Sequence, residues 1–190
     1  MESDIELMLR TKAGDDSAFS ELMNRHYKGV LNYIYRFTNL RENSEDLAQE
    51  VFLRVYRSAS KYRPEAKFTT WLYKIATNVS LTHVKKKNAN VSLDEMNENT
   101  GEYEDSEVEI SDDIIYRKEM KKVIFKAMET LPEREKIAIM LCKYEGLSYE
   151  ETADVLECTV GAVKAYVHRG RMKLVNKLKP YLTGEGEYGL

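Results

Sequence analysis

The chain has 190 residues and a hydrophobic fraction of 43%, which is enough for one large domain or two small domains with a buried core. Glycine and proline are scarce, at nine and three residues. This scarcity favours long helices and argues against an all-β fold, which needs many turns. The net charge of −3 is small, so the charge of the whole chain excludes neither an acidic nor a basic partner.

Charge divides the chain into segments of opposite sign. Residues 1–88 carry 15 Lys and Arg against 11 Asp and Glu, whereas residues 89–115 carry ten Asp and Glu and no Lys or Arg. Residues 116–182 return to a basic balance of 14 against nine, and the tail at residues 183–190 has a net charge of −2. We therefore expect two basic domains joined by an acidic linker.

Four helices are expected in the domain 1–88. A short helix that contains Met8 is expected first, and a second helix of about five turns follows a candidate N-cap at Asp16. The apolar side chains of the second helix are Phe19, Leu22, Met23, Tyr27, Val30, Leu31 and Ile34. A third helix, capped by Asn43 or Ser44, buries Leu47, Ala48, Val51, Phe52 and Val55. A fourth begins at Thr69 or Thr70, turns Trp71, Leu72, Ile75, Ala76 and Val79 inward, and ends at Lys85, Lys86 and Lys87.

The acidic linker is not expected to pack, because residues 88–113 combine low hydrophobicity with charge of one sign. As a flexible coil this segment spans roughly 30 Å. It can therefore hold the two domains apart.

The domain 116–182 is expected to end in a helix-turn-helix. Its first helix carries Met120, Val123, Ile124, Ala127 and Met128, and its second starts at Leu131-Pro132 with the stripe Ile137, Met140, Leu141 and Tyr144. After Gly146, Ser148 and Glu151 form a capping box for a short helix. Residues 157–159 turn the chain into a last helix that buries Val160, Val163, Val167, Leu174 and Leu178. The fold class is therefore all-α, with a helical bundle and a helix-turn-helix domain joined by a flexible acidic linker.

The last helix presents a basic outer face. Its outward residues are Lys164, His168, Arg169 and Arg171, with Ala165 and Tyr166 between them. Such side chains on a recognition helix can enter the major groove, where Lys or Arg bonded to guanine discriminates by about 1–3 kcal/mol. A merely solvated face has the same composition, but the preceding capping box and turn favour DNA binding.

The stretch 56–74 interleaves aromatic and basic residues: Tyr56, Arg57, Lys61, Tyr62, Arg63, Lys67, Phe68, Trp71, Tyr73 and Lys74. This combination is typical of surfaces that hold single-stranded DNA, because aromatic rings stack on bases and cations bind phosphates. Trp71 falls on the apolar stripe of its helix, so we expect it in the core. The pattern leaves Phe68 undecided between core and DNA.

Both halves of the chain resemble extracytoplasmic-function sigma factors of bacterial RNA polymerase. Residues 131–135 (LPERE), 145–153 (EGLSYEETA), 160–164 (VGAVK) and 168–171 (HRGR) look like the family's minus-35-reading domain. Residues 45–52 (EDLAQEVF) and 68–78 (FTTWLYKIATN) resemble its polymerase-binding and minus-10-reading helices. The resemblance covers both modules in the family's order. It departs at Glu157, Thr159 and Gly170, where relatives often carry Gly, Pro and Ala, and at Ala165-Tyr166 in place of a frequent Ser-Arg pair.

The resemblance implies a role for each set of residues. Asp46, Gln49 and Glu50 would bind core RNA polymerase, although an acidic first turn also complements the helix dipole. Minus-10 DNA would be bound by Lys61, Tyr62, Arg63, Lys67, Phe68, Lys74 and Asn78, and minus-35 DNA by Lys164, Ala165, Tyr166, His168, Arg169 and Arg171. The implied partners are core RNA polymerase, promoter DNA and an anti-sigma factor, and no cofactor or metal is implied. The linker would be a solubilising tether, would occupy the RNA path of the polymerase, or would compete with DNA for the basic helices.

Other function classes fit the sequence less well. An enzyme is not expected, because His26, His83 and His168 lie in three different helices and no phosphate loop or nucleophile motif is present. The alternative is a helix-turn-helix regulator that binds DNA without core polymerase. The N-terminus lacks a signal-peptide core, and the longest apolar run, residues 137–142, is too short to cross a membrane. Two cysteines, Cys142 and Cys158, fit free thiols in a reducing compartment, so we expect a cytoplasmic protein.

Overall fold

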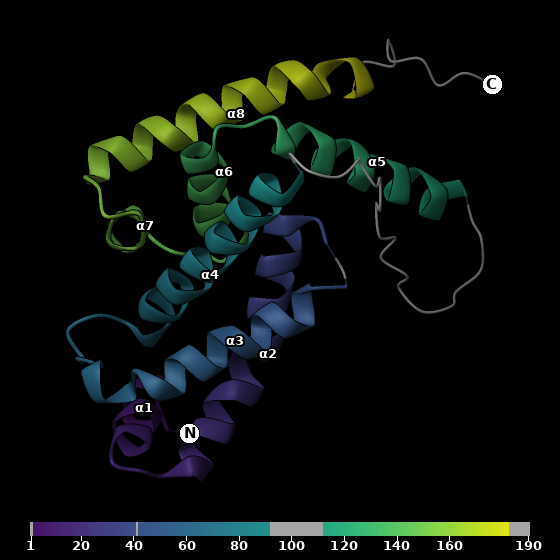
Figure 1. Ribbon diagram of the computed structural model, residues 1–190. Helices are drawn as coiled ribbons and strands as arrows, with labels where there is room; N and C mark the ends of the chain where they lie inside the picture. The colour runs from purple at the N-terminus through teal and green to yellow at the C-terminus, as the bar shows by residue number, and fades with distance from the viewer. Residues whose placement is uncertain (1, 41, 92–111, 183–190) are drawn as a thin grey trace.

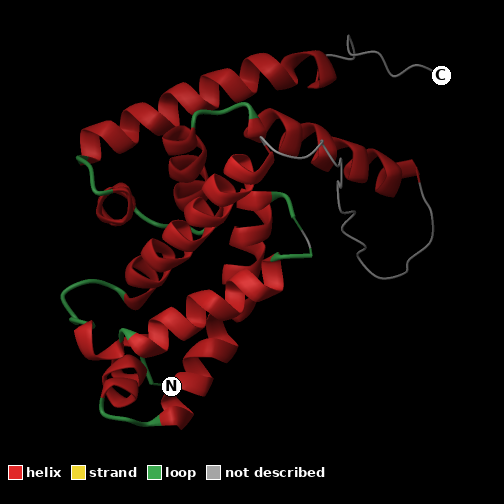
Figure 2. Cartoon of the chain, viewed as in Figure 1, coloured by secondary structure: helices red, strands yellow, loops and turns green. Residues whose placement is uncertain are grey.

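The computed structural model describes residues 2–40, 42–91 and 112–182, and the regular structure within these ranges is helical (Figure 1; Figure 2). The N-terminal unit contains α1 (Asp4–Lys12), α2 (Asp16–Thr38), α3 (Ser44–Arg57), a tighter turn at Ala59–Lys61, and α4 (Phe68–Val91). The C-terminal unit contains α5 (Asp112–Glu129), α6 (Glu133–Ile139), a π-helical turn at Met140–Tyr144, α7 (Tyr149–Leu156) and α8 (Val160–Leu182). The expectation of an all-α fold with two helical domains is confirmed.

The helices reach a few residues into the segment that the sequence assigns to the linker. Helix α4 continues to Val91 and helix α5 begins at Asp112. The rest of the linker prediction, on residues 92–111, and the predicted tail from residue 183 lie outside the described residues.

Apolar stripes on α2, α3 and α4 form the core of the N-terminal unit. Leu22 and Ile34 of α2, Val51 of α3 and Leu72 of α4 are all fully buried. The N-cap of α2 is Asp15, one residue before the expected position, and its carboxylate accepts from the N–H groups of Ser17 and Ala18. The predicted stripes therefore assemble into a single core as expected.

The C-terminal unit contains the expected capping box. Ser148 Oγ accepts from the N–H of Glu151 at 3.1 Å, and the Glu151 carboxylate accepts from the N–H of Ser148 at 2.7 Å. Thr159 then caps α8, because its hydroxyl accepts from the N–H of Ala162 at 3.2 Å. Between α7 and α8, Glu157 adopts a left-handed conformation with φ of 50°. The short turn between Leu156 and Val160 therefore joins α7 to α8 as a helix-turn-helix.

The prediction that Tyr144 lies in the buried stripe of its helix is wrong. The π-helical turn at Met140–Tyr144 adds one residue to a turn of the helix, so the residues beyond it leave the phase of the stripe. Tyr144 is 48% exposed, and its ring lies under the guanidinium of Arg36 from α2, 4.8 Å from the ring centre. The extra residue thus aims an aromatic side chain at the other unit.

Gly170 allows α6 and α8 to approach closely. A Cβ atom at this position would lie 2.5 Å from Ile139 Cδ1 and 3.4 Å from Glu135 Cβ, both on α6. Since carbon atoms pack at about 3.5–4.0 Å, the helices could not keep this separation with a larger residue. The glycine that departs from the family pattern is therefore explained by packing against Ile139.

The two units pack against each other along α4 and α7, which lie side by side (Figure 1). Helix α5 also reaches the N-terminal unit, where the rings of Phe125 and Tyr35 meet edge to face at 5.6 Å. The basic α4 and the helix-turn-helix are thus direct neighbours.

Among the described helices, none has an apolar stretch of the length that a membrane crossing requires.

Candidate nucleic-acid interface

A basic hollow lies where α3, the following turn and α4 meet. Its volume is about 380 Å³, and it is lined by Arg54, Arg57, Ser58, Lys61, Ile75 and Asn78. The structure therefore brings together Lys61 and Asn78, which the sequence resemblance placed in one minus-10 site. Arg54 and Ser58 were not among the expected site residues. The available signal was the helical spacing of positions 54, 58 and 61, although α3 ends at Arg57 and residues 59–61 form a separate, tighter turn.

The loop before α4 separates its charged residues from its rings. Lys61, Arg63 and Lys67 are exposed, whereas Tyr62 and Phe68 are each only 1% exposed. The Tyr62 ring lies 5.2 Å from that of Trp71 and 6.4 Å from that of Phe68. In this conformation neither buried ring can stack on a base, so their contact with DNA stays a prediction. Trp71 packs partly buried against the core, in line with its apolar position.

The other minus-10 residues face the C-terminal unit. Lys74 Nζ lies 2.8 Å from Glu157 Oε1, and Lys67 Nζ lies 3.0 Å from Glu151 Oε1. Glu157 is solvent-exposed, and the hydrogen bond from Lys74 lowers the pKa of its carboxyl. Two of the cations expected to bind DNA are thus paired with carboxylates of the helix-turn-helix, an arrangement that the sequence did not predict.

Helix α8 presents three basic side chains on one face. Lys164, His168 and Arg171 are exposed, and their spacing of four and three residues aligns them along the helix. Ala165 and Tyr166 are partly buried between this face and the core. The structure therefore brings the expected minus-35 residues onto the helix that follows a tight turn, which is the geometry of a recognition helix.

Arg169 is held by α6. Its Nε donates to Glu135 Oε1 at 3.1 Å, while Lys173 Nζ donates to Glu135 Oε2 at 2.9 Å. Glu135 is only 5% exposed, and burial opposes its ionisation, but the hydrogen bonds from Lys173 and Arg169 outweigh burial and lower its pKa. The ring of Tyr166 lies 5.3 Å from the Arg169 guanidinium carbon. Arg169 is thus tied to both α6 and its own helix.

The acidic face of α3 lies on its first two turns. Asp46 and Gln49 are exposed, and Glu50 accepts from Arg54 Nε at 2.6 Å. Positions 46, 49 and 50 share one side of the helix. This side is available to a partner protein, as the expected polymerase contact requires.

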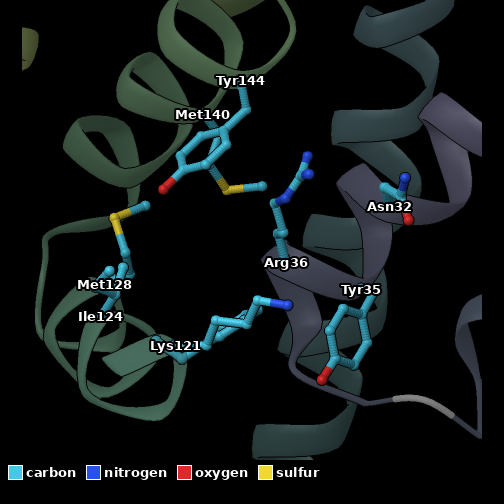
Figure 3. A pocket seen from close by; sticks show the side chains of 9 residues that line it. Asn32, Tyr35, Arg36, Lys121, Ile124, Met128, Met140 and Tyr144 are labelled. Atoms are coloured by element: carbon cyan, nitrogen blue, oxygen red, sulfur yellow. The ribbon is translucent and has the colours of Figure 1, made fainter. Parts of the chain in front are cut away.

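An apolar cavity of about 390 Å³ lies between the units (Figure 3). Its lining residues are Asn32, Tyr35, Arg36, Lys121, Ile124, Phe125, Met128, Met140 and Tyr144. They come from α2, α5 and the π-helical turn, and Figure 3 shows that Arg36 extends from α2 toward Tyr144 and Met140. No sequence pattern predicts this cavity, because it forms only where the two units meet.

Comparison with known proteins identifies both units. Residues 22–90 match the family model of Sigma-70 region 2, and residues 121–174 match that of Sigma-70, region 4. The chain is 31% identical over 186 residues to the RNA polymerase sigma-H factor of Pseudomonas aeruginosa, covering 95% of this chain and 96% of the relative. It is also 31% identical over 185 residues to the ECF RNA polymerase sigma-E factor of Haemophilus influenzae, covering 95% of this chain and 97% of the relative.

Solved structures agree on the fold. CnrH, in complex with the cytosolic domain of CnrY, matches with a TM-score of 0.69 at 20% identity, over 94% of this chain and 98% of that chain. The sigma factor RpoE of Bartonella quintana, in complex with the anti-sigma factor NepR, matches with a TM-score of 0.67 at 19% identity, over 85% of this chain and 96% of that chain.

Proposed function

Because the chain belongs to the ECF family of RNA polymerase sigma factors, we propose that it binds core RNA polymerase and directs it to promoters. The N-terminal unit reads the minus-10 element and the C-terminal unit reads the minus-35 element. The observation that carries this proposal is that one chain contains two different basic sites. One is the hollow around Lys61 and Asn78, and the other is the exposed face of α8. A regulator that only binds duplex DNA has no need of the first site.

The hollow at the end of α3 is suited to an unpaired strand. Arg54, Arg57 and Lys61 supply positive charge for phosphates, and Asn78 supplies donors and an acceptor for a base edge. Lys67 and Lys74 extend the positive charge along the loop and α4. Tyr62 and Phe68 support this surface from beneath through the ring cluster with Trp71.

Helix α8 is suited to the major groove. Lys164, His168 and Arg171 reach outward for base edges or phosphates. Arg169 contributes a further positive charge. Its hydrogen bond to Glu135 holds its guanidinium beside the ring of Tyr166. The two units must engage separated stretches of one promoter, a task for which residues 89–115 act as the tether.

The exposed α3 face is the proposed polymerase contact. A change of Asp46 to Arg reverses a charge on this face, whereas the same change at exposed Glu21 lies on α2, outside it. We expect Asp46→Arg to weaken comigration with core polymerase in gel filtration by about tenfold in affinity, as for a removed charge contact, and Glu21→Arg to have a smaller effect. Equal comigration of both variants and the unchanged protein would contradict the assignment of this face.

An anti-sigma factor and a cytoplasmic location complete the proposal. The related fold of RpoE is held by the anti-sigma factor NepR, and we expect a protein of that kind to bind this chain as well. Promoter recognition takes place where the chromosome lies, so the cytoplasm is the expected compartment. Sigma factors initiate transcription as subunits of the polymerase, so no catalytic residue is proposed.

A further inference from the structure

Helix α1 contacts the loop that carries part of the proposed minus-10 site. We define the minus-10 loop as residues 62–67, between the turn Ala59–Lys61 and α4. Lys12, the last residue of α1, donates from Nζ to the main-chain oxygen of Tyr62 at 3.1 Å. Helix α1 precedes the residues matched to region 2, which begin at residue 22, so the family match gives this helix no role.

Tyr62 is the internal support of the minus-10 loop. Its side chain is 1% exposed, and its hydroxyl donates to the main-chain oxygen of Ala66 at 3.4 Å. Its own N–H donates to the oxygen of Ala59 at 3.0 Å. Lys61 and Arg63, which precede and follow it, are exposed and are expected to bind DNA. The position of Tyr62 therefore fixes where these two cations lie.

The other end of the minus-10 loop is tied to α1 through His26 of α2. The His26 ring lies 5.3 Å from the ring of Phe68, the first residue of α4. His26 Nε2 lies 2.7 Å from Asp4 Oδ2 on α1, and Arg25 Nη1 donates to Asp4 Oδ1 at 3.1 Å. The side chains of Asp4, Arg25 and His26 are only 19–27% exposed. Helix α1 thus holds both ends of the loop, one directly and one through His26.

A loop that is held in place before DNA arrives binds DNA better than a loose one. Ordering a chain segment costs conformational entropy, and a preorganised segment does not incur this cost at the moment of binding. An ammonium group forms a stronger hydrogen bond to a carbonyl oxygen than a neutral donor does. Lys12 is therefore suited to fix the main chain at the start of the loop.

We propose that Lys12 is a positioning residue of the minus-10 site, and that α1 holds the minus-10 loop in the conformation that receives the unpaired strand. Lys12 acts through Tyr62 and makes no contact with DNA. This inference rests on the proposed function, because positioning the loop affects transcription only if the loop binds promoter DNA.

Three substitutions in α1 separate the hydrogen bond from general effects on the helix. Lys12→Met keeps the aliphatic stem and removes the donor, whereas Lys12→Arg keeps a cationic donor. Arg10→Met is the matched control, because it removes the same charge from the same helix. The Arg10 guanidinium pairs with Glu2 and Asp15, at 2.6 Å each, and not with the loop.

Native-state hydrogen exchange of the full chain without DNA tests the support of the loop. The amides of Tyr62, Thr70 and Trp71 are hydrogen-bonded at the two ends of the minus-10 loop. Lys12→Met should speed exchange of the Tyr62 amide about tenfold, the lower end of the effect of a hydrogen bond to a charged group, because Lys12 is exposed to water. Exchange in the middle of α2 should not change, and Lys12→Arg and Arg10→Met should behave as the unchanged protein does. An unchanged Tyr62 amide, or equal acceleration throughout the N-terminal unit, would overturn the proposal.

Asp4→Ala tests the second contact. It removes the partner of His26 and leaves Lys12 in place, so the amides of Thr70 and Trp71 should exchange faster by a larger factor than that of Tyr62. Equal exchange in this variant and the unchanged protein would overturn the support through His26.

Promoter opening by the holoenzyme tests the positioning role. Core polymerase saturated with each variant is mixed with a promoter selected from random sequences, and permanganate reactivity of unpaired thymines measures the open complex. Lys12→Met should reduce opening about tenfold through the loss of preorganisation, without weakening binding to a duplex that carries only the upstream element. Lys12→Arg should restore opening.

The outcomes distinguish failure of the positioning role from failure of the proposed function. Equal opening with Lys12→Met and the unchanged protein would overturn the role of Lys12, as would an equal loss with Arg10→Met. If the unchanged protein opens no promoter, the proposed function is wrong and the positioning role is overturned with it, while the exchange rates still decide whether α1 holds the loop.

Discussion

The close contact of Gly170 with Ile139 makes a prediction in which two opposing effects can be compared. Gly170 lies inside α8, where alanine is intrinsically more favourable than glycine by about 1 kcal/mol. Against this gain, a Cβ would sit 2.5 Å from Ile139 Cδ1, and overpacking of a buried site costs typically about 1–3 kcal/mol. Ile139 is 4% exposed and has little room to turn away. We therefore expect Gly170→Ala to destabilise the C-terminal unit by about 1 kcal/mol.

A second substitution removes the clash and isolates its contribution. Ile139→Val deletes Cδ1 and by itself costs about 1 kcal/mol. In that background Gly170→Ala fills the vacated space, and the expected sign reverses to a stabilisation of up to about 1 kcal/mol. The two sites should thus be coupled by about 2 kcal/mol, within the range of residues in contact.

Native-state hydrogen exchange of the α6 and α8 amides measures this coupling in the unit concerned. The free energies of opening of all four proteins complete the double-mutant cycle. If Gly170→Ala stabilises α8 equally with Ile and with Val at position 139, then the helices separate without cost and the explanation of this glycine by close packing is refuted.

Three further predictions concern stability. Tyr33→Phe leaves Thr77 without the buried hydroxyl partner now 2.7 Å away, so the N-terminal unit should lose about 1–3 kcal/mol in urea titrations; an unchanged midpoint would contradict that hydrogen bond. Glu135 has a lowered pKa in the folded protein, so its contribution to stability is present above its unfolded pKa and is lost as pH falls through the folded value. Glu135→Gln should therefore be less stable than the unchanged protein at pH 7 and approach it at low pH, and parallel pH profiles would contradict the charged pairing. Glu157→Gly relieves a left-handed conformation and should raise the thermal stability of the helix-turn-helix by up to about 1 kcal/mol; a lower melting temperature would show that the carboxylate outweighs the strain.

Local patterns predicted the elements of this fold well, because helix formation and capping depend on neighbouring residues. The period of apolar residues identified the buried face of α2, and the Ser148–Glu151 capping box is present as expected. The π-helical turn was not predictable from the same period, since one inserted residue changes the phase without changing composition. Tyr144 was placed in the core for this reason.

The candidate site was predictable in part. Basic residues such as Lys164 lie on an exposed helix face as expected, because outward positions follow from the apolar register. The burial of Tyr62 was not foreseen, because a ring in a loop carries no periodicity that tells core from surface. The pairing of Lys74 with Glu157 joins residues far apart in sequence, and only the contact between the two units brings them together.

Transcription from a reconstituted polymerase shows whether this chain selects promoters. Core RNA polymerase is incubated with this chain and a library of random upstream sequences, and the 5′ ends of the transcripts are sequenced. We expect transcripts that depend on the chain and start at a fixed distance from a shared two-part motif, with the upstream part changing its base preference when Lys164 is replaced by Ala. Transcripts no more numerous than those of core polymerase alone, or start sites without a common motif, would contradict this expectation.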